Sequence, residues 1–207
     1  RKIRVTKPIT YLLGYHFKRS HERIEIDITY RCNLRCYNCN RSCRQAPSDM
    51  DITTELVRRF VQSSIEKGKT WKSIRVLGGE PTLHPEFEKI LLILMELKVK
   101  TPSTRITVVT NGCGRLVGRK LLRVPRSIHV ENSNKESKSQ KYFEPFNMAP
   151  VDNWFSSFID FRNGCDNLEK CGIGLTPMGY YPCAISGGID RLTNWKVGYT
   201  DLPDDDD

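Results

Sequence analysis

The chain has 207 residues, and 33 lysines and arginines against 24 aspartates and glutamates give it a formal charge of +9. This length suits one domain, or one domain with a small appendage, and no run of about 18 apolar residues is present to span a membrane. The first residues lack the apolar core and cleavage site of a secretion signal, so we expect a cytoplasmic protein whose eight cysteines are reduced.

Strands and helices are predicted to alternate between residues 24 and 131. Alternating apolar and polar residues over 24–30 predict a strand, and apolar residues at helical spacing over 51–67 predict a helix. The same patterns predict further strands at 73–77, 105–110 and 127–131, and further helices at 86–98 and 115–122. This order is typical of parallel βαβ units in an α/β fold, which bind ligands at the carboxyl ends of their strands.

The alternation weakens in the last third of the chain. Residues 132–140 are polar and rich in residues that break regular structure, so we expect an exposed loop there. Residues 154–161 fit either a strand or a short helix, and residues 172–182 predict a hairpin around Pro177, Met178 and Gly179. The acidic run at 204–207 is expected to be solvated.

Four of the cysteines crowd directly behind the first predicted strand, and Cys32, Cys36 and Cys39 have the spacing C-x3-C-x2-C. Thiolates at this density favour zinc or an iron–sulfur cluster. Structural zinc usually takes four ligands in two close pairs, which this spacing lacks. A four-iron cluster on three thiolates instead keeps one iron open to a further ligand. Because Cys43 extends the spacing toward part of a ferredoxin motif, a closed, electron-carrying cluster remains an alternative.

A second group of cysteines near the C-terminus, Cys165, Cys171 and Cys183, predicts a second metal centre. Zinc and reduced structural cysteines are the alternatives at this place. Cys113 stands apart from both groups and is interpreted as a buried free thiol.

Each of the first three predicted strands ends in a distinctive loop. The loop of Cys32, Cys36 and Cys39 follows the first strand, Gly78-Gly79-Glu80-Pro81 follows the second, and Thr110-Asn111-Gly112 follows the third. In this order the loops resemble those of the radical S-adenosylmethionine (radical SAM) superfamily, over about residues 24–131. The resemblance implies a partial (β/α)6 barrel in which the three cysteines are the catalytic ligands of a [4Fe–4S] cluster. SAM would chelate the fourth iron and be cleaved reductively to a 5′-deoxyadenosyl radical that abstracts hydrogen from a substrate.

The resemblance also implies which residues bind SAM. Gly78, Gly79 and Glu80 would meet the amino group of its methionine part, because glycines let the backbone approach and a carboxylate complements an ammonium group. Thr110 and Asn111 would contact the methionine or ribose end.

One position in the first loop departs from the family pattern. The family often has an aromatic residue directly before the third cysteine, where its backbone meets the adenine ring. Here Asn38 has that position and Tyr37 precedes it, so these two residues are the predicted adenine contacts.

The segment from Cys171 to Cys183 resembles the cysteine-bearing hairpin of the SPASM and twitch extensions, which hold auxiliary iron–sulfur clusters in many radical SAM enzymes. Three residues separate Gly179 from Cys183, where that pattern has four, and the usual run of downstream cysteines is absent. We therefore expect one auxiliary [4Fe–4S] cluster on Cys165, Cys171 and Cys183. Its fourth ligand would be Cys43, Cys113 or the substrate itself.

The predicted fold class is therefore α/β, a partial (β/α)6-type radical SAM barrel that is abbreviated in its second half and carries a small cysteine-bearing hairpin extension. A basic N-terminal segment is expected at 1–22 and the core barrel at 23–150. The remaining strands and the twitch-like extension are expected at 151–200, and an acidic tail at 201–207.

The predicted function is that of a radical SAM enzyme, an oxidoreductase in the broad sense. An auxiliary cluster suits dehydrogenation, epimerisation or bond formation on an unidentified small-molecule or peptide substrate. The alternative is a non-catalytic iron–sulfur or zinc protein for electron transfer or binding. The basic surface fits an anionic substrate or an acidic reductant such as flavodoxin or ferredoxin, and equally an ordinary solvated face. No nucleic-acid-binding module is recognisable.

Overall fold

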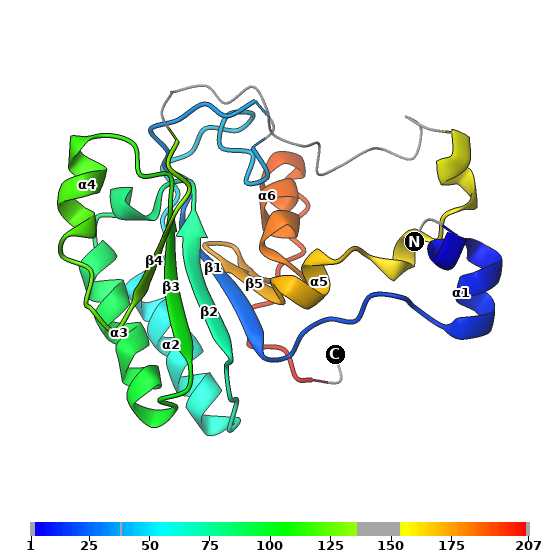
Figure 1. Ribbon diagram of the computed structural model, residues 1–207, viewed down its shortest axis with the longest axis horizontal. Coiled ribbons are helices and arrows are strands. Elements are labelled where there is room, and N and C mark those ends of the chain that lie inside the picture. The colour runs from blue at the N-terminus through cyan, green and yellow to red at the C-terminus, as the bar shows by residue number, and fades with distance from the viewer. Residues whose placement is uncertain (1–2, 38, 136–153, 206–207) are drawn as a thin grey trace.

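A computed structural model describes residues 3–37, 39–135 and 154–205. Its centre is one sheet, and the six strands found among these residues have the order β4-β3-β2-β1-β5-β6 (Figure 1). The strands are β1 (Arg23–Thr29), β2 (Ser73–Gly78), β3 (Arg105–Thr110), β4 (His129–Asn132), β5 (Ile173–Thr176) and β6 (Gly179–Tyr181). All neighbours pair in parallel except β5 and β6, so the predicted α/β class with a mostly parallel sheet is confirmed.

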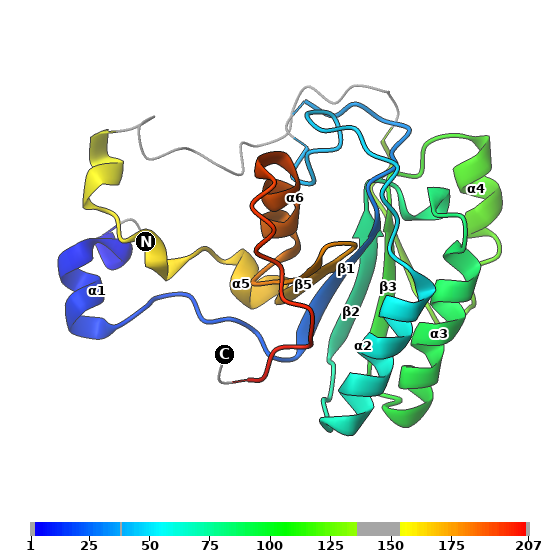
Figure 2. The same cartoon turned by 180° about the vertical axis from the view of Figure 1, so that it is seen from behind.

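The predicted helices follow the predicted strands. Helices α2 (Thr54–Glu66) and α3 (Phe87–Lys100) connect β1, β2 and β3 and cover one face of the sheet, and α4 (Arg115–Leu121) precedes β4 (Figures 1 and 2). Thr53 caps α2, because its side chain accepts a hydrogen bond from the Leu56 N–H at 3.2 Å. The ends of these elements differ from the prediction by a few residues at most, which is ordinary for helix ends.

The side chains on the two faces of strand β1 differ: one face packs into the apolar core and the other carries polar residues. Ile24, Ile26 and Ile28 are buried in the apolar core, which they share with residues of α2 and α3 such as Phe60 and Ile90. The alternate residues of the strand point to the opposite face, away from these helices. That opposite face carries Glu25, Asp27 and Thr29, all buried as well, and it forms the floor of the site described below.

The predicted C-terminal hairpin is present and extends the sheet beside β1. Strand β5 runs parallel to β1, with Ile24 opposite Ile173, and turns back into β6. Helix α6 (Ala184–Thr193) follows and lies on the opposite side of the sheet from α2 and α3 (Figures 1 and 2). A Cβ on Gly174 would lie 2.2 Å from the Ala184 nitrogen, so the hairpin and the start of α6 are in close contact.

The N-terminal residues pack against a distant part of the chain. Helix α1 (Lys7–Leu13) follows a short 3-10 turn, η1 (Ile3–Val5), and both lie beside the 3-10 turns η4 (Trp154–Phe158) and η5 (Phe161–Asn163). Asn163 donates to Thr10 Oγ1 at 2.7 Å and accepts from the His16 N–H at 2.7 Å. The segment over 154–161, which fits a strand or a short helix in sequence, is thus mainly a short 3-10 helix.

Asp204 and Asp205 of the acidic tail are exposed but ion-paired. Asp204 lies 2.6 Å from Lys67, and Asp205 pairs with Lys69 and His21. The expectation of a merely solvated run is therefore incomplete. Of the expected loop at 132–140, residues 136–140 lie outside the described part of the chain.

Candidate functional site

The cysteine loop spans residues 30–50, between β1 and α2, and its ends are tied together. The Tyr30 N–H donates to the Met50 carbonyl at 3.0 Å, and Thr29 Oγ1 donates to Asp51 at 2.6 Å. The Arg31 guanidinium pairs with the same Asp51 carboxylate at 3.0 Å. This closed base holds the loop at the carboxyl end of β1, where α/β sheets place their ligand sites.

The first three thiols of the cysteine loop are free. Cys36 is buried, and Cys32 and Cys39 are half-buried. Burial, opposed by a hydrogen bond from the Leu34 N–H and aided by the charges of Cys39, Glu80 and Cys36, raises the pKa of Cys32 to about 11. Among the residues that the structure describes, the three thiols are not grouped as ligands of a metal ion, so their joint role stays a prediction.

Nitrogen donors surround these sulfur atoms. The Leu34 N–H lies 3.5 Å from Cys32 Sγ, the Asn111 amide 4.0 Å from the same sulfur, and the Lys135 ammonium 3.5 Å from Cys36 Sγ. Donors of this kind favour thiolates over thiols and tune the potential of iron–sulfur clusters. The donor set therefore fits a cluster held by three thiolates.

Cys43 belongs to this first group. Its thiol shares a hydrogen bond with Cys39, which lowers the pKa of Cys39 to about 5 and raises that of Cys43 far above its ordinary value. Cys43 is itself buried. Of the fourth ligands considered for the second centre, Cys43 is thus already engaged with the first cysteines.

The glycines of the second loop allow it to pack onto the first. A Cβ on Gly78 would lie 2.2 Å from the Thr29 carbonyl oxygen, and one on Gly79 would lie 2.2 Å from that of Arg31. The Gly79 and Glu80 N–H groups donate to the same two carbonyls at 2.8 Å. Side chains here would separate β2 from β1, so these glycines have a packing role that the sequence interpretation did not assign to them.

The Glu80 carboxylate is completely buried and fully hydrogen-bonded. It accepts from the Thr82 hydroxyl at 2.8 Å, the Thr110 hydroxyl at 2.9 Å and the Asn111 N–H at 2.8 Å. It also caps the short 3-10 turn η2 (Pro81–Leu83) through the Thr82 N–H. Glu80 thereby links the second loop to the third, Thr110-Asn111-Gly112.

The third loop is tied to the cysteine loop in turn. The Asn111 amide donates to Asn33 Oδ1 at 2.9 Å, and the Asn33 amide donates to the Cys113 carbonyl at 2.7 Å. Cys113 takes part through its backbone, since its N–H also donates to Asn111 Oδ1 at 2.7 Å. Cys113 is half-buried rather than buried, and it lies beside the first cysteine group. The three loops predicted to act together thus meet at one edge of the sheet.

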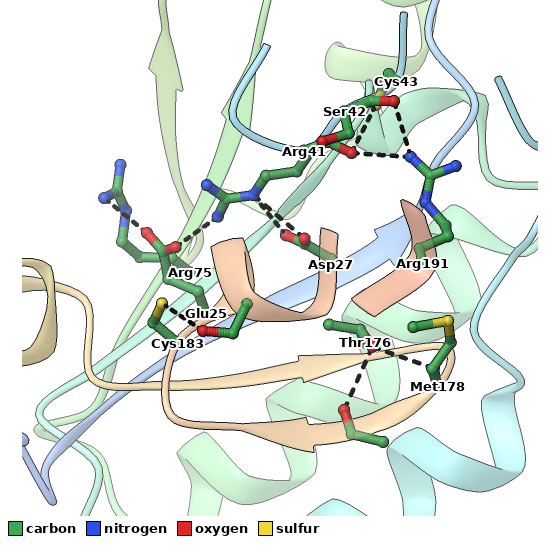
Figure 3. A network of polar contacts seen from close by, with 12 residues as sticks. Glu25, Asp27, Arg41, Ser42, Cys43, Arg75, Thr176, Met178, Cys183 and Arg191 are labelled. Carbon is green, nitrogen blue, oxygen red and sulfur yellow. Dashed lines mark hydrogen bonds and ion pairs between the residues drawn. The ribbon is translucent and has the colours of Figure 1, made fainter. Parts of the chain in front are cut away.

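A buried charge cluster lies under the cysteine loop and was missed by the sequence interpretation (Figure 3). Arg41 inserts its guanidinium between two acids of β1, at 3.2 Å from Asp27 and 2.5 Å from Glu25. Arg75 of β2 pairs with Glu25 at 3.2 Å and with Glu131 of β4 at 2.8 Å. Burial raises the pKa of Asp27 to about 6, although Arg41 opposes this shift. The alternation in β1 signals the two acids, but nothing in the sequence marks Arg41 as their partner.

A cavity of about 320 Å³ opens between the three loops and the C-terminal hairpin. The predicted SAM contacts Gly78, Gly79, Thr110 and Asn111 line one part of it. Cys171 and Cys183 line it as well, and its polar lining consists of Glu25, Asn40, Arg41, Arg75, Ser133, Lys135 and Asn167. The cavity therefore borders the second group of cysteines. Cys32, Cys36 and Cys39 are not among its lining residues, but the lining residues Asn111 and Lys135 reach Cys32 and Cys36.

Two of the three C-terminal cysteines lie at this cavity. Cys171 lies two residues before β5, and burial together with Glu25 raises its pKa to about 12. Cys183 is the residue before α6, with its Sγ 3.3 Å from the Ser186 hydroxyl. Cys165 is exposed and does not line the cavity. Over the described ranges, no three His, Cys, Asp or Glu side chains are grouped so that they would hold a single metal ion.

Of the two predicted adenine contacts, the structure describes Tyr37 alone. Tyr37 is exposed, does not line the cavity, and has the Arg44 guanidinium 5.5 Å from its ring centre. Asn38 lies outside the described residues.

Within the part of the chain that the structure describes, every helix is too short or too polar to cross a bilayer.

Comparison with known families assigns this site to a class. Residues 26–121 match the Radical SAM superfamily, a range that includes the cysteine loop and the two loops that meet it. This part of the chain is thus similar to the radical SAM superfamily. The match supports the predicted enzyme class, whose members use a [4Fe–4S] cluster and SAM.

Particular relatives narrow the comparison. The mitochondrial GTP 3′,8-cyclase of Arabidopsis thaliana is 28% identical over 194 residues, which cover 90% of this chain and 44% of that protein. A probable GTP 3′,8-cyclase of Archaeoglobus fulgidus is 24% identical over 190 residues, covering 91% of this chain and 58% of that protein. The chain thus spans about half the length of these curated relatives.

A solved structure supports the fold. The crystal structure of BtrN in complex with AdoMet and 2-DOIA aligns with a TM-score of 0.57 over 84% of this chain and 77% of that one, at 15% identity. At that identity the likeness concerns the arrangement of strands and helices. It agrees with an abbreviated radical SAM barrel.

Proposed function

We propose that this chain forms the catalytic part of a radical SAM enzyme that cleaves SAM reductively and abstracts hydrogen from a small substrate in the 320 Å³ cavity. The observation that carries this proposal is the meeting of the three loops. Cys32, Glu80 and Asn111 come from three different strand ends, and hydrogen bonds and packing hold these ends together beside one cavity.

Cys32, Cys36 and Cys39 would hold the catalytic [4Fe–4S] cluster. When bound, the reduced cluster and SAM supply methionine and a 5′-deoxyadenosyl radical. The chain's own residues hold and shield these groups, and the donors around the sulfur atoms, Leu34, Asn111 and Lys135, stabilise negative charge on the thiolates.

For SAM itself we propose that Gly79, Thr110 and Asn111 supply the nearest contacts, with Gly78 in support. The sequence also predicts a direct contact between Glu80 and the methionine amino group. Because the Glu80 oxygens already accept from Thr82, Thr110 and Asn111, we propose that Glu80 orients the third loop and meets an ammonium only if one of these donors is displaced. Tyr37 and Asn38 remain predicted adenine contacts.

The C-terminal cysteines are proposed to hold one auxiliary [4Fe–4S] cluster in a twitch-like extension. Cys171 and Cys183 line the cavity, and the exposed Cys165 would have to approach them. Since Cys43 bonds to Cys39 and Cys113 lies beside Asn33, we propose that a substrate atom is the fourth ligand. This arrangement suits oxidation, epimerisation or bond formation.

GTP is the first substrate to test, because the relatives that cover most of this chain are named GTP 3′,8-cyclases. We propose that the cations that line the cavity, Arg41, Arg75 and Lys135, attract an anionic group of the substrate. We further propose a low-potential one-electron donor such as flavodoxin or ferredoxin, and a cytoplasmic location.

The test is release of 5′-deoxyadenosine by anaerobically reconstituted protein with SAM, dithionite and GTP. We expect release from the wild type and none from Cys36→Ala. Cys113→Ala is the matched control, because Cys113 meets Asn33 and Asn111 through its backbone, and it should retain release. Iron-loaded wild type that releases no 5′-deoxyadenosine, with or without GTP, would contradict the proposal and favour a passive iron–sulfur protein.

A further inference from the structure

The side chain of Arg191, in the last turn of α6, is hydrogen-bonded to the backbone of the cysteine loop (Figure 3). Its Nη2 donates to the Arg41 carbonyl at 2.9 Å and to the Ser42 carbonyl at 3.0 Å, and Nη1 donates to the Ala46 carbonyl. The guanidinium also lies 4.2 Å from the centre of the Tyr30 ring. One side chain thus satisfies three backbone acceptors in the second half of a loop that has no helix or strand of its own.

Arg41 is held at both ends as a result. Its side chain is buried between Asp27 and Glu25 of β1, while its carbonyl is held by Arg191 of α6. Arg41 lies two residues after Cys39 and two residues before Cys43. The backbone that carries these two cysteines is therefore fixed from the sheet on one side and from α6 on the other.

Two adjacent glycines let α6 fit between the hairpin and the cysteine loop. A Cβ on Gly188 would lie 3.3 Å from the Cα of Arg41, tighter than ordinary contact. A Cβ on Gly187 would lie 2.6 Å from Cγ2 of Thr176 in β5. Since α6 begins directly after Cys183, the same helix adjoins the second cysteine group at its first residue and contacts the segment between Cys39 and Cys43 in its last turn.

We propose that Arg191 is a positioning residue for the first cluster site, and that α6 thereby makes the geometry of the Cys39–Cys43 segment depend on the C-terminal hairpin. The catalytic consequence rests on the function proposed above, whereas the mechanical claim concerns the protein alone. Charge-assisted hydrogen bonds to three carbonyls are among the stronger contacts available to a loop, so their loss lets the segment open locally more often.

The test is hydrogen exchange of the full chain, followed by mass spectrometry of peptides covering residues 39–46. We expect Arg191→Ala to speed exchange in this segment at least tenfold, while a peptide covering α3 changes less than twofold. Arg191→Lys keeps a cation that reaches fewer carbonyls and should give an intermediate rate. Thr193→Ala is the matched control, because the Thr193 hydroxyl donates to carbonyls of α6 itself, and it should leave the segment unchanged.

Unchanged protection of residues 39–46 in Arg191→Ala would overturn the proposal. Equal loss of protection in α3 for both Arg191→Ala and Arg191→Lys would overturn it as well, since the side chain would then support the whole fold. In reconstituted protein we expect Arg191→Ala to shift the reduction potential of the first cluster and to lower kcat for 5′-deoxyadenosine release more than it raises KM for SAM.

The two proposals fail separately. Faster exchange in Arg191→Ala, with no 5′-deoxyadenosine from the wild type, overturns the proposed function and supports the positioning role. If the wild type releases 5′-deoxyadenosine while hydrogen exchange and the reduction potential are unchanged in Arg191→Ala, the proposed function is supported and the positioning role of Arg191 is overturned.

Discussion

At the residue scale, Glu80 connects the second loop of the site to the third through hydrogen bonds. Its carboxylate is completely buried, and the hydrogen-bond donors around it come from Thr82 in its own loop and from Thr110 and Asn111 in the next. A carboxylate is acceptor-only, which suits a place surrounded by donors. Glu80 therefore joins two loops of the site whether or not it also touches a ligand.

Glu80→Gln is expected to destabilise the protein, because the new amide brings two N–H donors to a place that already has donors. We expect a loss of roughly 1–3 kcal/mol in the free energy of unfolding, measured by urea denaturation of the cluster-free chain. Glu96→Gln, on an exposed ion pair with Arg58, should change it by less than about 0.5 kcal/mol. Equal effects of the two substitutions would contradict the role given to Glu80.

Asp190 provides a pH-dependent prediction in the C-terminal unit. Burial opposes its ionisation, but hydrogen bonds from the Tyr181 hydroxyl at 2.5 Å and from the Val197 and Lys196 N–H groups outweigh burial and lower its pKa below 3.8. A lowered native pKa gives stability that is complete above the unfolded-state pKa and is lost as the pH falls through the native value.

Asp190→Asn should therefore cost roughly 1–3 kcal/mol at pH 7, and the difference from the wild type should shrink below about pH 4. Urea denaturation at a series of pH values measures this difference. A gap between the two proteins that stays constant from pH 7 to pH 3 would show that ionised Asp190 does not contribute as described.

At the scale of elements, two glycine-to-alanine substitutions distinguish two effects on stability. One is the steric clash of an added methyl group, and the other is the backbone entropy that a glycine loses on folding. Gly79→Ala places a methyl group 2.2 Å from the Arg31 carbonyl and should destabilise the protein by about 2 kcal/mol or more. Gly118 lies inside α4 with open space around its Cβ position, so Gly118→Ala should stabilise the protein by about 0.5–1 kcal/mol. Thermal unfolding of both variants measures the contrast, and a similar shift in both would argue against the close approach of β2 to β1.

The elements from β1 to β4 were predictable because each carries its own local signal. The apolar periodicity of α2 and α3 and the alternation of β1 are visible within single segments, and each motif loop directly follows a strand. Helix α1 and the 3-10 turn η1 were not predicted, since α1 is short and its tyrosine and leucines are exposed rather than facing a core. Helix α6 carries Gly187 and Gly188, which usually disfavour a helix but here allow its close contacts.

The pairing of the hairpin with β1 and the charge cluster under the cysteine loop are non-local, which is why the sequence did not reveal them. Parallel pairing of β5 with β1 joins residues nearly 150 positions apart, such as Ile24 and Ile173. Likewise Arg191 and Arg41 meet only once α6 has docked on the loop. A sequence pattern predicts which residues lie on the same face of a strand or helix. It does not predict which distant segment of the chain packs against that face.

At the scale of the molecule, the two groups of cysteines come from distant parts of the chain, and of their members Cys171 and Cys183 line the cavity. Removing the second group should therefore affect one metal centre and spare the other. We expect about eight irons per chain in the reconstituted wild type and about four in Cys171→Ser/Cys183→Ser, by iron and sulfide analysis. Undiminished iron in the double variant would contradict the auxiliary cluster.

The most direct measurement of the central claim is the electron paramagnetic resonance spectrum of the reduced Cys171→Ser/Cys183→Ser protein, recorded with and without SAM. If Cys32, Cys36 and Cys39 hold a cluster with one open iron, adding SAM changes the spectrum, and Cys36→Ala in the same background removes the signal. A reduced, iron-loaded protein whose spectrum is unaltered by SAM would contradict the account of this site.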